Sequence, residues 1–236
     1  MNKDINNDTG KLVVIIMNTI KKSTLDYLKS LKVNNNREWF NNNRTAYIDA
    51  KENFESVVQK IINKLIDFEP IMQGLEVKNC VYRINRDIRF SHDKTPYKSH
   101  FGAFIVRGGK KNGDKFSGYY IHIEPGNSMI AGGAYMPPSP WLSSIREKID
   151  EEPDKLVKII NSIDFLKYFG KIEGEKLKKA PKGYPANHPN IELLKFKSYL
   201  VSNEVADKDI LSDGFFDHVI DVCRAMKPFN DFLNQY

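Results

Sequence analysis

The sequence predicts a protein of the α+β class, because helical and strand-like patterns occupy separate stretches of the chain. Apolar residues recur at helical spacing over residues 23–68 and again beyond residue 139. Between these regions, short segments rich in aromatic and β-branched residues alternate with turn sequences. We therefore expect an antiparallel β-meander of about four or five strands, packed against N-terminal and C-terminal helices.

The N-terminal part is expected to comprise a polar extension and the start of the domain. We assign residues 1–21 to an N-terminal extension and residues 22–236 to a single α+β domain. Residues 11–19 fit either an extra strand or a simple tether.

Two helical stretches follow the extension. Ser23 or Thr24 is a suitable N-cap for a helix that ends near Val33. A longer helical stretch covers residues 39–68, and we predict a break near Arg44 because three asparagines precede it and weaken the helix.

Strands are predicted over residues 78–84, 101–107, 118–124 and 128–135. Residues 108–113 and 125–127 are rich in Gly, Asn and Pro and predict turns that join the last three strands.

The C-terminal part is predicted to be mainly helical. Ser139 is a candidate cap for a helix to about residue 152, and Pro153 opens another that ends near residue 160. Residues 170–188 predict a surface loop, and residues 191–201 fit either a helix or a strand. The last predicted helix covers residues 214–232.

The composition excludes several classes of protein. The chain has 236 residues, 41% hydrophobic and 28% charged, as in a globular protein with its own core. Its two cysteines, Cys80 and Cys223, lie in apolar segments and predict buried free thiols. The apolar run at residues 12–17 is too short to span a membrane and lacks the flanks of a signal peptide, so we expect a cytoplasmic protein with no membrane partner.

The positive charge is concentrated in one region. The net charge is +6, and residues 78–115 alone hold ten cations and three anions. Such a local excess attracts phosphate-bearing partners. The alternative is a solvated basic loop around Lys110 and Lys111.

The densest cluster of cations lies in residues 80–104, where aromatic residues are interleaved with them. The candidate ligand-binding residues are Arg83, Arg86, Arg89, Lys94 and Lys98. Guanidinium groups suit phosphate, sulfate or carboxylate. Alternatively, the arginines bond Asp87, Asp93 and loop carbonyls and thereby stiffen a long loop.

The strand at residues 118–124 predicts a second group of site residues. Alternation places Tyr120, His122 and Glu124 on one face, with Tyr120 as a candidate ligand-binding residue and His122 and Glu124 as candidate catalytic residues. The strand rise separates His122 and Glu124 by about 7 Å, which predicts that they flank a ligand without exchanging a proton directly. The alternative is a structural pairing of either residue with Arg83 or Lys98.

A metal centre is not expected from spacing. His92, Asp93, His100, His122 and Glu124 could come together, but no HExxH or similar motif is present, and the many cations oppose a divalent ion. No cofactor is predicted either.

Several motifs together resemble a known microbial family, the domain of unknown function 2461. They are Arg37-Glu38-Trp39-Phe40, the run from Tyr82 to Lys98, Gly118-Tyr119-Tyr120-x-His122-x-Glu124-Pro125-Gly126, Gly132-Gly133-x-Tyr135 and Ala180-Pro181-Lys182-Gly183-Tyr184. The resemblance covers about residues 22–235. It implies no reaction, substrate or cofactor, because the family has none assigned.

Three functions are compatible with these patterns. The first is an enzyme or binding protein for an anionic small molecule, phosphorylated or carboxylated. The second is a nucleic-acid-binding module, because basic and aromatic residues on a sheet suit nucleotide stacking. The third is a scaffold that docks an acidic partner through the basic loop, and the lack of a deep pocket would favour it.

Overall fold

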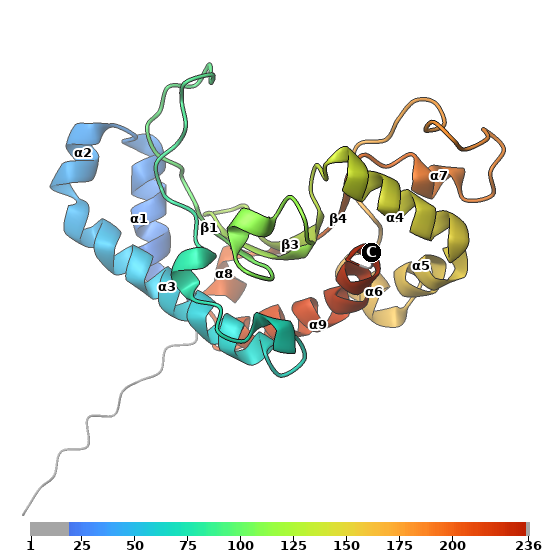
Figure 1. Ribbon diagram of the computed structural model, residues 1–236. Helices are drawn as coiled ribbons and strands as arrows, with labels where there is room; N and C mark the ends of the chain where they lie inside the picture. The colour runs from blue at the N-terminus through green and yellow to red at the C-terminus, as the bar shows by residue number, and fades with distance from the viewer. Residues whose placement is uncertain (1–18, 235–236) are drawn as a thin grey trace, which may run out of the picture.

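A four-stranded antiparallel sheet lies at the centre of the computed structural model, which describes residues 19–234 (Figure 1). The strands follow one another across the sheet as β1 (Phe101–Ile105), β2 (Gly118–Ile123), β3 (Ser128–Ala134) and β4 (Tyr199–Val205). The predicted α+β class and number of strands are confirmed. Residues 1–18, with most of the predicted extension and its strand or tether, lie outside the described residues.

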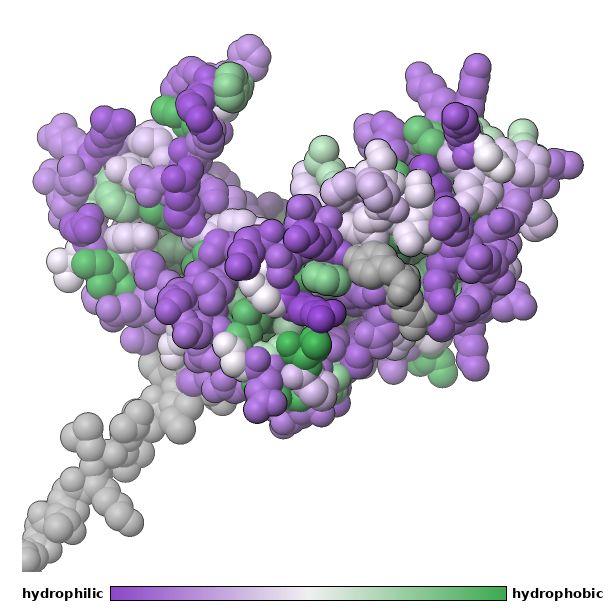
Figure 2. All heavy atoms as spheres, in the orientation of Figure 1, coloured by the Kyte–Doolittle hydropathy of each residue, from purple (hydrophilic) through white to green (hydrophobic). Residues whose placement is uncertain are grey.

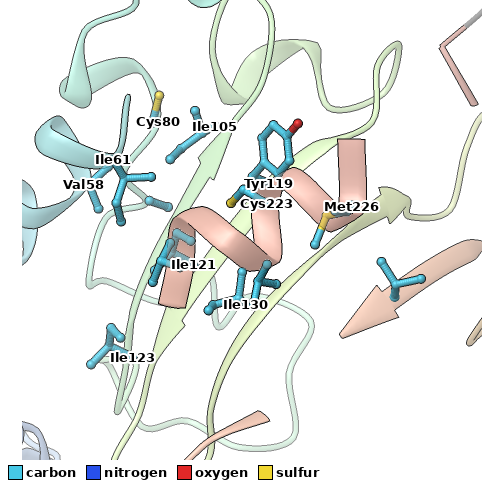
Figure 3. Packing of buried hydrophobic residues seen from close by; sticks show 14 of the residues in the cluster. Val58, Ile61, Cys80, Ile105, Tyr119, Ile121, Ile123, Ile130, Cys223 and Met226 are labelled. Atoms are coloured by element: carbon cyan, nitrogen blue, oxygen red, sulfur yellow. The ribbon is translucent and has the colours of Figure 1, made fainter. Parts of the chain in front are cut away.

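Two long helices cover one face of the sheet. Helix α3 (Arg44–Leu65) packs on β1, and α9 (Phe215–Leu233) packs on β3. Figure 3 shows side chains of both helices beside Ile121 and Ile130 from the sheet. As the alternation predicted, Tyr119, Ile121 and Ile123 of β2 point into this core. Burial of each such side chain stabilises the fold by roughly 1.5–3 kcal/mol.

Two shorter helices precede α3, namely α1 (Lys22–Val33) and α2 (Arg37–Asn42). Asn43 separates α2 from α3, which confirms the predicted break. The start of α2 is stabilised by Asn36, whose side chain accepts a hydrogen bond from the Trp39 amide at 2.9 Å.

The predicted cap of α1 is wrong. The helix is preceded by Lys21, and neither Ser23 nor Thr24 caps it. The Thr24 hydroxyl is buried and donates instead to the Asn53 side chain of α3 at 2.8 Å. The Lys21 amide donates to the same Asn53 oxygen at 2.9 Å, so Asn53 holds the start of α1 from a neighbouring helix.

The predicted strand at residues 78–84 is also wrong. A 3-10 turn (Val77–Asn79) opens this segment, and only Val81 forms a bridge with β1, opposite Ala103. The chain then turns away from the sheet, since Asn85 pairs with Tyr97 of its own return limb. The fourth strand is instead β4. Residues 191–201, which fitted either a helix or a strand, contain both: α7 (Ile191–Leu194) at their start and the first residues of β4 at their end.

Residues 84–98 form a separate hairpin, here called the basic hairpin. It is closed by hydrogen bonds from the Lys98 amide to the Ile84 carbonyl at 2.8 Å and from the Arg86 amide to the Pro96 carbonyl at 2.9 Å. Figure 1 shows it projecting from the body of the molecule beside α1 and α2.

The helices after the sheet match most predictions. Helices α4 (Ser139–Glu151) and α5 (Pro153–Ile160) have the expected bounds, but Pro138, not Ser139, is the N-cap of α4. The helices α6 (Ile163–Tyr168) and α8 (Asp207–Ile210) were not predicted. Residues 170–188 form the expected loop, which bridges to β4 at Glu173.

The paired glycines of β3 let backbone segments approach closely. A β-carbon at Gly132 would lie 2.3 Å from both the Gly118 carbonyl oxygen and the Met226 sulfur. At Gly133, φ is 109° and a β-carbon would lie 2.0 Å from the Tyr199 carbonyl oxygen. This motif is therefore part of the packing between β2, β3, β4 and α9.

Both predicted thiols are confirmed as free and buried. No helix within residues 19–234 has the length and apolar character that crossing a membrane requires.

Candidate functional site

A groove of about 750 Å³ lies on the face of the sheet opposite α3 and α9. Its apolar lining includes Phe104 from β1, Met129 and Ala131 from β3, and Leu200 from β4, and Tyr120 from β2 also lines it. Figure 2 shows the molecule hollowed between the basic hairpin and the part that holds α4 and α7. A pocket large enough for a small molecule is therefore present.

A polar cluster is built at one end of this open face. Tyr120 and His122 come from β2, Glu124 directly follows β2, and His100 directly precedes β1. The β1–β2 register sets Phe101 opposite Ile123 and thereby brings His100 beside Glu124. Tyr120 and His100 also line the groove, so the cluster and the groove are continuous.

The side chains of this cluster contact one another directly. His122 Nε2 lies 3.3 Å from Glu124 Oε2, and His122 Nδ1 lies 3.0 Å from the Tyr120 hydroxyl. The ring centroids of His100 and His122 are 4.3 Å apart. The predicted separation of His122 and Glu124 is wrong, because the strand rise fixes backbone spacing, while both side chains lean along the strand toward each other.

Glu124 is held by several donors. The Ser99 hydroxyl donates to Oε1 at 2.9 Å, and the Asn127 amide donates to Oε2 at 3.1 Å. Lys32 Nζ from α1 lies 3.4 Å from Oε1. Burial alone would raise the pKa of Glu124, but the hydrogen bonds from Asn127, Ser99 and His122, with Lys32 nearby, lower it to about 2. Glu124 is therefore ionised at neutral pH.

Burial keeps the other titratable groups of the cluster neutral. Burial, with a smaller contribution from the nearby His122, lowers the pKa of His100 to about 4. Burial also lowers the pKa of His122, and the hydrogen bond and charge of Glu124 partly offset this effect. Burial and the nearby Tyr82 raise the pKa of Tyr120 to about 12. At neutral pH the cluster thus holds one carboxylate, two neutral imidazoles and one phenol.

These protonation states define what the cluster can do. The ionised Glu124 only accepts, so in this arrangement His122 donates from Nε2 and Nδ1 accepts from Tyr120. The Tyr120 hydroxyl holds the His122 ring by this hydrogen bond, and Glu124 would stabilise the charged form of His122 if the imidazole took up a proton. Within residues 19–234, His100, His122 and Glu124 are also the group of side chains that could share a metal ion, with ligand atoms within 4.8 Å of one another.

Lysines on the edge of the groove lack carboxylate partners. Lys98 donates to the Arg83 carbonyl at 3.0 Å and lies 5.3 Å from the centre of the Tyr82 ring, and Lys110 donates to the Lys78 carbonyl at 3.0 Å. Neither lysine, nor Lys111, forms an ion pair with a carboxylate that the structure describes. Burial, with Arg83 nearby, lowers the pKa of Lys98.

The predicted arginines lie elsewhere, and those of the basic hairpin bond within it. Arg86 donates hydrogen bonds to Asp93, Thr95 and, at 3.3 Å, the Ser91 hydroxyl. Arg89 forms a bidentate ion pair with Asp87, with distances of 2.9 and 2.6 Å. Lys94 donates to the Ile88 carbonyl at 3.0 Å. Arg83 is exposed at the base of the hairpin. Among the residues predicted to bind a ligand, Lys98 and Tyr120 line the groove, whereas Arg83, Arg86, Arg89 and Lys94 do not.

The side chains of residues 78–84 do not alternate as they would in the predicted strand. Tyr82 lines the groove while Ile84 is buried in the core, so these residues do not share a face. The predicted structural pairing of His122 or Glu124 with Arg83 or Lys98 does not occur either, because Glu124 contacts Ser99, Asn127 and Lys32 instead.

The sequence prediction missed Ser99 and Lys32, which contact the cluster, and it considered His100 only as a metal ligand that was not expected. Ser99 and Lys32 carry no sequence signal, because both act only through the fold. His100 could have been found, since a turn joining residues 101–107 to 118–124 with Phe101 opposite Ile123 sets His100 opposite Glu124.

The fold and the site together define an α+β domain with a groove on the open face of its sheet. The chain belongs to the family described as conserved hypothetical protein (DUF2461), whose model matches residues 23–232. The predicted resemblance is thereby confirmed. Comparisons with curated proteins and with solved structures give no match.

Proposed function

We propose that the groove binds an anionic small molecule, phosphorylated or carboxylated. The observation that carries this proposal is the combination of an apolar floor with Lys98, Lys110 and Lys111, none of which is neutralised by a described carboxylate. Such a site suits a molecule with an apolar or ring-shaped part and an acidic group.

The charges along the groove favour an anion. Asp114 and Glu173 also line it, so the three lysines leave one excess positive charge. Lys98 uses one of its three N–H donors on the Arg83 carbonyl and has donors left for a phosphate or carboxylate oxygen. Partial burial of Lys98 strengthens a charge-assisted hydrogen bond relative to one in water.

His122 and Glu124 are the residues that we assign to chemistry on this ligand. Neither residue lines the groove itself, but His122 contacts the hydroxyl of Tyr120, which does. In this proposal Tyr120 also binds the ligand, while His122 takes up a proton and Glu124 stabilises the resulting charge.

A thermal-shift screen tests the proposal. The panel holds inorganic phosphate, sugar phosphates, nucleotides and small carboxylates, and the variants are Lys98→Ala and, as a matched control, Lys94→Ala in the basic hairpin. At a hundred times its Kd a ligand stabilises the protein by about 2.7 kcal/mol, a shift of roughly 5–10 °C at this size. We expect one class of anion to shift the wild type and Lys94→Ala but not Lys98→Ala. Equal shifts in all three proteins would contradict the assignment.

The basic hairpin favours a second function, docking of an acidic partner. Phe90 is 94% exposed, and Arg89 lies beside its ring at 5.9 Å. With Arg83, Arg86 and Lys94 the hairpin offers cations around an exposed aromatic ring, a combination common at protein interfaces.

Fluorescence anisotropy with a poly-glutamate peptide and with a single-stranded oligonucleotide tests the hairpin. In this proposal the peptide binds at low salt, Phe90→Ala weakens it several-fold, and Phe116→Ala outside the hairpin does not. Binding of the oligonucleotide alone, with a steep loss on adding salt, would instead identify a nucleic-acid module. No binding of either probe would remove the hairpin as a docking site.

We also infer a cytoplasmic location, which the two free buried thiols favour because a reducing compartment preserves them. Fractionation of the source cells with a specific antibody tests it, and recovery with secreted or membrane fractions would contradict it.

A further inference from the structure

We propose that His100, His122 and Glu124 hold a divalent transition-metal ion. Two imidazoles and one carboxylate form a ligand set common to catalytic zinc and non-haem iron sites. The three ligand atoms lie within 4.8 Å of one another. The inference goes beyond the proposed function, because it concerns the metal alone and does not need the anionic ligand.

The spacing of the ligand atoms fits such an ion. Bonds of about 2.0–2.1 Å at tetrahedral angles place neighbouring ligand atoms about 3.4 Å apart. His122 Nε2 and Glu124 Oε2 are 3.3 Å apart, so this edge of the coordination sphere is already formed. The His100 ring, 4.3 Å from the His122 ring between centroids, needs only a side-chain adjustment to close the set.

The neighbours of the three residues orient them as metal ligands. Metal-binding histidines commonly use their second ring nitrogen in a hydrogen bond, and His122 Nδ1 faces the Tyr120 hydroxyl at 3.0 Å. Ser99 and Lys32 hold Oε1 of Glu124, while Oε2, which also accepts from the Asn127 amide, is directed at His122. With a metal on Nε2, His122 would carry its proton on Nδ1 and donate it to the Tyr120 oxygen, so His122 would then act as a metal ligand in place of taking up a proton.

The surroundings of the cluster can accommodate the charge of a divalent ion and leave one of its coordination positions open. Arg86 and Arg89, which counted against a divalent ion, lie in the basic hairpin and pair with its own carboxylates. Lys32 and Lys98 remain nearby, and Glu124 is ionised beside Lys32. His100 lines the groove, so an ion here would face it and could take water or an anion as its fourth ligand.

Cobalt titration of untagged, EDTA-treated, full-length protein tests the inference. Co²⁺ reports four- or five-coordinate binding through its visible d–d absorption and substitutes for Zn²⁺ in such sites. We expect one ion per chain with visible absorption, displaced by Zn²⁺. His100→Gln and Glu124→Gln should each weaken Co²⁺ binding by about 100-fold or more, because a ligand contributes more than the 10- to 100-fold of an outer-shell partner. The control variant is His188→Gln, because His188 contacts Asp150 and is not part of the cluster. Its affinity for Co²⁺ should equal that of the wild type.

The outcomes separate this inference from the proposed function. Circular dichroism first shows that each variant is folded; should Glu124→Gln fail to fold, His100→Gln and His122→Gln carry the test. Absence of Co²⁺ absorption in the wild type, or equal binding in the ligand variants and the control, overturns the metal site. Lys98→Ala should bind Co²⁺ normally, so loss of anion binding without loss of metal distinguishes failure of one proposal from failure of the other.

Discussion

Glu124 sets the chemistry of the cluster at the scale of single residues. It accepts from Ser99, Asn127 and His122, and these bonds offset burial and keep it ionised. A carboxylate fixed in this way can stabilise a charged imidazole or bind a metal, whereas a protonated carboxyl group could do neither. In the function that we propose, Glu124 would therefore need no change of protonation when a ligand binds.

Tyr120→Phe should weaken Co²⁺ binding by about 10-fold, because it removes the group that faces His122 Nδ1 and orients the ring. The measurement is the same cobalt titration. Tyr135→Phe is the matched control, since this tyrosine also lines the groove but is largely exposed. Unchanged affinity in Tyr120→Phe would show that Tyr120 does not position His122.

The two thiols should be unreactive in the native protein. Cys80 and Cys223 are fully buried, and burial raises the pKa of Cys80 to about 11 and raises that of Cys223 further. With a thiol reagent at pH 8, we expect no modification of the native chain within an hour and modification of both cysteines in urea. Rapid native labelling of Cys80 would contradict its position behind β1.

At the scale of elements, the sheet owes its close strand packing to Gly132 and Gly133. Both positions face a neighbouring backbone at distances that a β-carbon cannot enter. Gly132 and Gly133 also line the groove, so the spacing of these strands sets the width of its floor.

Gly133→Ala should destabilise the protein by roughly 2–4 kcal/mol, since it combines a positive φ with a contact to the Tyr199 carbonyl. Urea unfolding measures the change. Gly126→Ala is the matched control, because its φ of 75° is also positive but nothing lies within 4 Å, and it should cost about 1–2 kcal/mol. Equal effects would show that the close approach in β3 is unimportant.

Arg86→Ala should loosen the basic hairpin without unfolding the domain, because Arg86 joins Asp93, Thr95 and Ser91 within the hairpin alone. We expect trypsin to cleave at Arg89 or Lys94 several times faster, with the urea midpoint nearly unchanged. Arg37→Ala in α2 serves as the control. Slow cleavage like that of the wild type would show that this network does not hold the hairpin.

The elements that alternation defines could be predicted from the sequence, and the others could not. Strands β1, β2 and β3 show a clear period of two between turns. Residues 78–84 have strand composition, yet only Val81 bridges to β1 before the chain turns into the hairpin. Strand β4 begins within residues 191–201, a segment with no clear period. Because 64 residues separate it from β3, its place beside that strand is decided by the tertiary fold.

At the scale of the whole molecule, the site depends on contacts that no local pattern contains. Alternation placed Tyr120, His122 and Glu124 on one face, and the structure adds His100 from β1's start and Lys32 from α1. Most of the arginines that pointed to a binding site in the sequence lie in the basic hairpin, where Arg86 and Arg89 form ion pairs with Asp93 and Asp87. The groove arises because helices cover one face of the sheet and leave the other open (Figure 1).

Chemical-shift mapping of ¹⁵N-labelled full-length protein during titration with inorganic phosphate tests most directly whether the groove binds anions. Because we propose that the open face of the sheet binds an anion, we expect saturable shifts at Lys98, Tyr120, Met129 and Leu200, which line the groove on separate segments. Residues of α9 on the opposite face should not shift. Shifts confined to the basic hairpin, or none at all up to high phosphate concentration, would contradict the claim.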